Sequence, residues 1–167
     1  MNRLKIFACT AILAGCTVSL ISQEPVKKDL AREFQEADLA FHFDKNYLRA
    51  ASLYEPLLVK YPDNENVAAK LGICYLNMDG KKKEALDLLR KAVTNLAADE
   101  KSYVNHGEQA PPDTYMYLGM AWHMNDSLSQ AVDCFYTEKK RLAGTDPDKD
   151  EYIDILIRDS RYAAEQK

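Results

Sequence analysis

Apolar residues recur every three or four positions through most of the chain after residue 28, which is the spacing of one face of an α-helix. Short polar stretches rich in Asp, Asn, Gly and Pro separate these segments. The pattern predicts helices at about 29–43, 46–60, 64–78, 81–97, 112–125, 128–143 and 147–164. The sequence therefore indicates an all-α protein.

The stretch from Ala68 to Ala92 shows this pattern most clearly. Its two apolar halves are joined by the turn Asp79–Lys83, which is short enough to connect two antiparallel helices. A glycine inside a helix costs about 1 kcal/mol relative to alanine, so Gly72 is expected to serve close packing. We expect Gly72 and Ala85 to let the two helices approach each other, with Leu89 filling the space beside them.

Two other segments repeat this arrangement. The corresponding residues are Phe34, Ala37, Asp38, Phe41, Ala50 and Tyr54 in the first copy, Ala68, Leu71, Gly72, Tyr75, Ala85 and Leu89 in the second, and Tyr115, Leu118, Gly119, Trp122, Ala131 and Phe135 in the third. The pattern resembles the tetratricopeptide repeat (TPR), whose signature is W-x2-L-G-x2-Y followed by A-x3-F and a proline. The resemblance implies a TPR-like solenoid of three helix-turn-helix repeats at about 31–64, 65–97 and 112–145.

The chain departs from the repeat pattern in two places. Asp38 stands where the family has a small residue, and we expect it to cap a helix or to face solvent. The second repeat carries one extra residue in its turn. A long polar connection at 98–111 also exceeds a TPR turn, and such loops are either functional or merely mobile.

The last predicted helix, 147–164, is expected to cap the solenoid. Pro147 suits the first helical position, and acidic residues follow it in the first turn. Its apolar face should pack on the third repeat, whereas the opposite face should contact water. The packing residues are Ile153, Leu156, Ile157 and Ser160, and the exposed ones are Asp154, Arg158, Asp159 and Arg161.

Residues 1–22 read as a targeting segment rather than as part of the folded domain, which spans 23–167. A basic start is followed by the apolar run Ile6–Leu13 and by Leu13-Ala14-Gly15-Cys16, which resembles the lipobox of bacterial lipoproteins. That resemblance implies acyl chains on Cys16 and stable anchoring to a membrane. The alternative is an ordinary secretory signal cut near Ser22. The apolar run is too short and interrupted for a retained transmembrane helix.

Composition and charge exclude some classes of function. The chain is 47% hydrophobic and 29% charged, which is the composition of a globular protein. Its formal net charge is −4, and residues 1–15 contain two basic residues and no acidic one, so the remainder is more negative still. We therefore expect no nucleic-acid partner, since such proteins carry a basic patch.

The sequence contains no recognisable catalytic, metal or cofactor motif, so we expect no enzyme and no cofactor. His42, His106 and His123 are far apart and lie in no metal-binding spacing. An enzymatic alternative would need a site in the 98–111 loop that uses His106 and Glu108.

Two cysteines belong to the predicted helices, Cys74 and Cys134. They are expected to be separate buried thiols, with a disulfide as the alternative in an oxidising periplasm.

The TPR resemblance implies that the first helix of each repeat lines a concave groove that binds a partner. The groove residues by register are Arg32, Gln35, Leu39, His42 and Phe43; then Asn66, Ala69, Ile73, Leu76 and Asn77; then Asp113, Met116, Met120, His123 and Met124. The set lacks the repeated Lys, Arg and Asn that clamp a C-terminal carboxylate in chaperone-binding TPRs. The three methionines are expected to be exposed and to make an adaptable apolar contact. In the alternative, the last helix or the long loop covers these residues.

Two longer stretches, residues 70–93 and 110–139, extend the resemblance. They are similar to the N-terminal TPR segment of envelope proteins linked to type IX secretion and gliding, in which an OmpA-like domain follows. For this chain the resemblance implies only the TPR module. It favours an adaptor that binds another envelope protein, as an outer-membrane lipoprotein facing the periplasm or, as an alternative, as a soluble periplasmic protein. A peptide or small-molecule carrier that uses the groove is the competing function.

Overall fold

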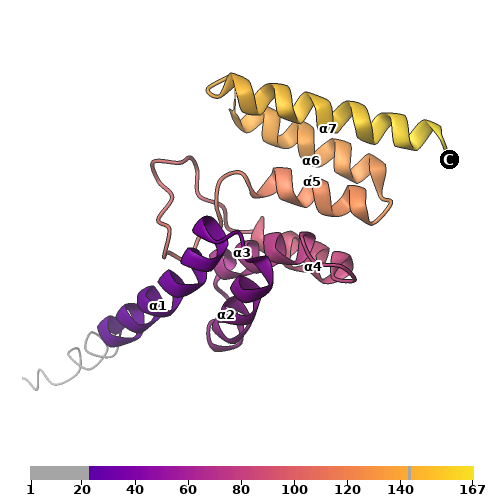
Figure 1. Cartoon of the computed structure of the whole chain (residues 1–167). Coiled ribbons are helices and arrows are strands. Elements are labelled where there is room, and N and C mark those ends of the chain that lie inside the picture. Colours follow the sequence, from indigo (N-terminus) through magenta and orange to yellow (C-terminus); the bar gives the residue numbers. More distant parts are fainter. Residues whose placement is uncertain (1–22, 143) are drawn as a thin grey trace, which may run out of the picture.

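The computed structural model describes residues 23–142 and 144–167, and within them the chain is helical throughout its regular structure (Figure 1). This confirms the predicted all-α class. The expected targeting segment, with the lipid site Cys16, lies outside the described residues. None of the described helices combines the length and apolar composition that a membrane crossing requires.

The helices follow one another with short connections except between the fourth and the fifth. They are α1 (Gln23–Asp38), which continues directly into the π-helix η1 (Leu39–Phe43), α2 (Tyr47–Lys60), α3 (Glu65–Leu76), α4 (Lys82–Ala92), α5 (Thr114–Met124), α6 (Leu128–Leu142) and α7 (Pro147–Glu165). Each helix packs mainly against its neighbours in sequence, and α3–α5 and α5–α7 also touch. Figure 1 shows α5, α6 and α7 stacked in order on one side of the molecule.

Side-chain caps fix the starts of three helices. The side chains of Asn46, Asn64 and Asp146 accept hydrogen bonds from backbone N–H groups three residues on, at 2.9, 3.0 and 3.0 Å. Each bond satisfies an N–H group that the first helical turn leaves unpaired. The caps at Asn64 and at Asp146, with Pro147 next, confirm two predicted starts.

The fourth helix ends at Ala92, so the prediction of a helix to residue 97 was wrong. Beyond Val93 the backbone pairs with the far end of the long connection instead. Ala97 N donates to Ala110 O at 3.0 Å, and Ala110 N donates to Asn95 O at 2.9 Å. The β-branched Val93 and Thr94 and the following Asn95 are weak helix formers, which favours this pairing over continued helix.

Two helix pairs pack through a glycine, as the sequence predicted. A Cβ added at Gly72 would lie 2.8 Å from Cγ of Leu89, and one added at Gly119 would lie 2.6 Å from Cδ1 of Phe135. Both distances are far inside van der Waals contact. The glycines on α3 and α5 therefore let α4 and α6 approach closely.

The last helix covers the third pair in the way expected of a cap. Ile153, Ile157 and Ser160 are buried, and Leu156 is partly buried. Ile153 and Ile157 form a core cluster with Met116 of α5 and Phe135 of α6. The predicted outer residues Asp154, Arg158, Asp159 and Arg161 are exposed.

Candidate functional site

The first helix pair differs from the others because it buries a carboxylate at the glycine position. Asp38 is 7% exposed and its side chain makes no helix-capping hydrogen bond within the described residues, so the expectation that it caps a helix or faces solvent was wrong. Its Oδ1 accepts a hydrogen bond from the Tyr54 hydroxyl at 2.5 Å and one from Lys70 Nζ at 2.6 Å. Asn105 donates to Oδ2, and His106 Nε2 lies 3.5 Å from the same oxygen. The carboxylate thus joins α1, α2, α3 and the long loop.

Lys70 is the buried counter-ion of this cluster. Its ammonium group has three protons, and it donates to Asp38 Oδ1 and to Asn105 Oδ1, both at 2.6 Å. The ring of Phe34 lies 5.0 Å from Nζ on a further side. Burial lowers the pKa of Lys70, and the charge of Asp38 opposes that shift. The ammonium group is therefore buried with an opposite charge and two hydrogen-bond acceptors.

The 98–111 loop is held against α3 by a buried asparagine. The Asn66 side chain donates to Asn105 O at 2.8 Å and accepts from the Tyr103 hydroxyl at 3.0 Å. The Asn66 backbone N–H donates to Glu108 O at 3.1 Å. These bonds fix the loop in place, and they therefore argue against the alternative of a merely mobile connection.

His106 and Glu108, the residues of the enzymatic alternative, do not share one site. His106 packs its ring 5.6 Å from that of Phe34 and lies beside Asp38. Glu108 is exposed. Among the described residues, the side-chain hydrogen-bond partner of the His106 ring is Asn105, which is not a nucleophile.

A cavity of about 180 Å³ opens between η1, α3, α5 and the loop. Residues predicted to line the concave groove come together here from all three helix pairs, namely His42, Ile73 and Asp113. Aromatic and acidic side chains surround them. The full lining is Phe41, His42, Lys70, Ile73, Glu100, Tyr103, Asn105, Pro111, Asp113 and Tyr117.

The charged groups around the cavity leave it acidic. Partial burial and the nearby Lys70 charge lower the pKa of His42, so the ring is neutral at pH 7. The charge of Lys70 is offset by that of Asp38, and among the described residues Lys149 is the one cation within ion-pair distance of Asp113, at 3.7 Å. Burial raises the pKa of Tyr117 to about 12, with Asp113 adding to the effect. The carboxylates of Glu100 and Asp113 therefore set the sign of the charge.

The remaining groove residues fall into three groups. Asn66 lies beneath the loop, and Met116, Met120 and His123 lie at or beneath α7, where His123 Nδ1 is 2.8 Å from the Ser160 hydroxyl. Ala69 and Leu76 are buried in the core. The exposed residues are Arg32, Gln35, Leu39, Phe43, Asn77 and Met124. Both the loop and the last helix thus cover part of the predicted groove.

The prediction of an exposed methionine face was wrong for two of its three members. Met116 is 6% exposed and belongs to the core cluster with Ile153 and Ile157, and Met120 is partly buried against the same cluster. Met124, at 42%, is exposed. The spacing of four residues between the methionines predicted a binding face, but α7 packs against that face.

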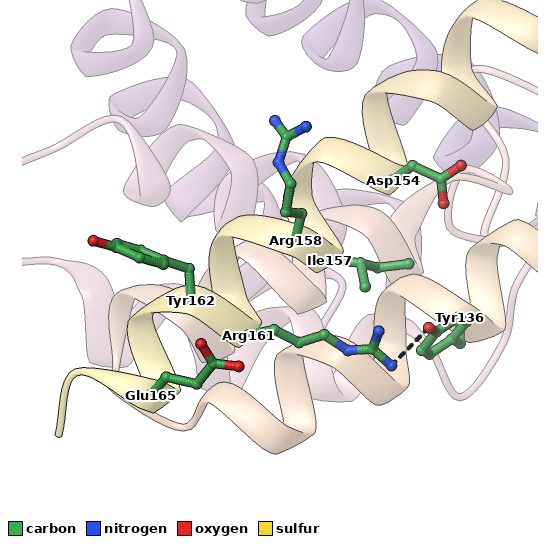
Figure 2. A pocket seen from close by; sticks show the side chains of 7 residues that line it. All are labelled: Tyr136, Asp154, Ile157, Arg158, Arg161, Tyr162 and Glu165. Carbon is green, nitrogen blue, oxygen red and sulfur yellow. Dashed lines mark hydrogen bonds between the residues drawn. The ribbon is translucent and has the colours of Figure 1, made fainter.

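Two other hollows are more open than this cavity. One lies between α2 and α4 beside Leu58, Val59 and Leu88. Figure 2 shows the other, on α7, where Arg161 donates to the Tyr136 hydroxyl at 2.9 Å while Arg158 and Tyr162 point away from it in different directions. The side chains in Figure 2 do not converge on a common point, so the less open cavity at the loop is the stronger candidate.

The two cysteines are free thiols, as expected, although Cys134 is only partly buried. Burial raises the pKa of Cys74 to about 12 and that of Cys134 to about 11. Both are therefore protonated and weakly reactive at neutral pH. Within the described residues, no group of three His, Cys, Asp or Glu side chains is placed to hold a metal ion.

Sequence reasoning missed Lys70, Tyr103 and Asn105 as members of the site. A signal for Lys70 was available, because it is the one charged residue in the apolar stretch Val67–Leu76. Comparison with protein-family models and with curated proteins found no match. The function of the cavity is therefore argued from its own geometry.

Proposed function

We propose that the chain is an adaptor of the bacterial cell envelope, built as a TPR-like solenoid that binds a segment of a partner protein in its concave groove. The observation that carries the proposal is the cavity to which His42, Ile73 and Asp113 all contribute. These residues belong to the first helix of each pair or its immediate flank, as groove binding requires. Stacking of successive helix pairs also supports a solenoid.

The proposed anchor is a lipid on Cys16, which places the adaptor at the periplasmic face of the outer membrane. The partner is then another envelope protein, in line with the secretion-associated proteins that the sequence resembles. Labelling with a fatty-acid analogue should tag the protein, and Cys16→Ser should abolish the label. A labelled Cys16→Ser variant would remove the anchor from the proposal but leave the groove untouched.

The size of the cavity favours protein binding over the carrier alternative. At about 180 Å³ it is smaller than the range of about 300–1,000 Å³ that is usual for small-molecule sites. It has room for one side chain of a partner, and exposed groove residues such as Leu39 and Asn77 remain accessible for further contacts. A partner segment is therefore the better match.

Photo-crosslinking in living cells tests which face binds the partner. A photoreactive residue is placed at Leu39 or Asn77, both exposed on the groove side, and at Val59 or Ser129 on the second helices as matched exposed controls. The groove positions should crosslink to one discrete protein, and the controls should not. Crosslinking from Val59 alone would move the binding face to the hollow between α2 and α4.

A further inference from the structure

The cavity has the dimensions of a receptor for one side chain. It is a partly open cavity bordered by η1, α3, α5 and the 98–111 loop, and the loop is fixed there through Asn66 and Asn105. A pocket that is already formed spends little free energy on ordering when it binds a guest. The chemistry of the lining then decides which side chain it accepts.

An anionic guest meets little uncompensated positive charge in this cavity. Among the described residues that line it, Lys70 is the one lysine or arginine; its ammonium group donates to Asp38 and to Asn105, and its charge is offset by that of Asp38. His42 is neutral at pH 7 because partial burial and Lys70 lower its pKa. A carboxylate or phosphate would enter beside Glu100 and Asp113 without a free positive charge to offset them.

A cationic guest instead meets two carboxylates that have few partners within the protein. Among the described residues, no side-chain hydrogen bond is made by Glu100, and the carboxylate of Asp113 has only the Lys149 ammonium group, at the long distance of 3.7 Å. A cation that enters the cavity is therefore attracted by the carboxylates of Glu100 and Asp113.

The lining also includes three aromatic residues, Phe41, Tyr103 and Tyr117. A guanidinium group stacks on aromatic faces and gives planar, paired hydrogen bonds to carboxylates, whereas an ammonium group acts as a hydrated point charge. A lining that combines aromatic rings with carboxylates therefore favours arginine over lysine.

We propose that this cavity receives an arginine side chain of the partner protein, bound between the aromatic rings and the carboxylates of Glu100 and Asp113. The inference rests on the proposed function, because it identifies the chemistry that the partner presents to the groove. It makes the 98–111 loop, which supplies Glu100, Tyr103 and Asn105, a determinant of specificity.

Titration of the full chain with capped pentapeptides, followed by two-dimensional NMR, tests the proposal. The peptides are Ala-Ala-Arg-Ala-Ala and its citrulline and glutamate analogues; citrulline keeps the shape of arginine without the charge. The arginine peptide should cause saturable shifts at Ile73, Tyr103 and Tyr117, with a dissociation constant on the order of 1 mM, about −4 kcal/mol. Equal binding of the citrulline peptide, or tighter binding of the glutamate peptide, would overturn it.

Two variants locate the effect at the carboxylates. Glu100→Gln and Asp113→Asn should each weaken the arginine peptide about three- to tenfold, through loss of one charge partner. Glu108→Gln, an equal change of charge on the same loop outside the lining, should bind like wild type. Because Glu100 is exposed, its variant should keep the fold, and unchanged binding there would contradict the proposed site.

The crosslinking experiment and the peptide titration together separate this inference from the proposed function. If groove positions crosslink to a partner but the arginine peptide causes no shift, the adaptor function stands and the arginine site fails. If the arginine peptide binds but only positions on the second helices crosslink, the site exists but does not serve the proposed groove.

Discussion

Two buried carboxyl groups, in the first and the third helix pairs, are treated in opposite ways by the fold. Asp38 has hydrogen bonds from Tyr54, Lys70 and Asn105, so its burial is compensated by a full set of partners. Glu138 on α6 is 1% exposed, and its Oε2 has no hydrogen-bond partner among the described residues. Burial raises its pKa to about 7.

The register of the repeats explains why each carboxyl group is exceptional. Asp38 occupies the position of Gly72 and Gly119, and Tyr54 occupies that of Leu89 and Phe135. Where two pairs pack a side chain onto a glycine, the first pair packs a hydroxyl onto a carboxylate. Glu138 stands seven residues after Ala131, where the other pairs have the apolar Leu57 and Ala92.

The comparison teaches that a departure from a repeat pattern needs neighbours from outside the repeat. Asp38 draws its counter-ion from α3 and two further partners from the loop, and α1 changes into the π-helix η1 directly after it. Such π-helical turns occur frequently at functional sites. In this chain the π-helical turn carries Phe41 and His42 to the cavity.

The largest expected loss of stability comes from removing the counter-ion of Asp38. Lys70→Met leaves Asp38 as an unpaired buried charge and should cost about 3–5 kcal/mol of stability, measured by urea denaturation. Adding Asp38→Ala to Lys70→Met should recover most of the loss, since it removes the charge as well. A double variant no more stable than the single one would show that the pair is not what holds the first helix pair.

The carboxyl group of Glu138, whose Oε2 has no hydrogen-bond partner in the described part of the chain, predicts that stability depends on pH. The pKa of Glu138 in the folded chain is above its ordinary value of 4.5, so the folded chain holds the proton more tightly than the unfolded chain. Stability should therefore fall as pH rises from about 4.5 to about 7. Glu138→Gln should remove this fall and be more stable than wild type at pH 8 by on the order of 2–3 kcal/mol.

The control for that prediction is an exposed carboxylate on another second helix, Glu84, changed to Gln. Its denaturation midpoint should follow the wild-type pH dependence between pH 4.5 and pH 8. At pH 4 the Glu138→Gln variant and wild type should be equally stable. An equal gap between them at pH 4 and pH 8 would mean that the gain comes from packing and not from ionisation.

The two helix pairs that pack through a glycine should be destabilised by a larger side chain at that glycine. Gly119→Leu forces a side chain into the Phe135 ring and should cost about 1–3 kcal/mol. Met124→Leu on the same helix, at an exposed position, is the matched control and should change the melting temperature little. A Gly119→Leu variant that melts with wild type would contradict the close approach of α5 and α6.

Periodicity was sufficient for the helices and for the Gly72 and Gly119 contacts because those depend on residues close in sequence. The end of α4 at Ala92 was not predictable, since it depends on pairing with Ala110 across the loop. The site was predicted in part. His42, Ile73 and Asp113 follow from register, whereas Lys70, Asn105 and Tyr103 reach it through contacts more than thirty residues apart, as in Asp38–Lys70.

The smallest expected effect is the difference in stability between alanine substitutions at Gly72 and at Gly119. An alanine gains about 1 kcal/mol of helix propensity over glycine, and its Cβ must then find room. At Gly72 the obstacle is Leu89, whose Cγ and Cδ2 lie 2.8 and 3.2 Å away on a side chain with rotatable bonds. At Gly119 it is the rigid ring of Phe135, with Cδ1 at 2.6 Å and Cζ at 2.9 Å. Gly72→Ala should therefore change the unfolding free energy by less than about 1 kcal/mol, with the propensity gain offsetting a small shift of Leu89, and Gly119→Ala should cost more. Urea denaturation of both variants beside wild type measures the difference, and a Gly119→Ala variant at least as stable as Gly72→Ala would show that the ring gives way as easily as the leucine.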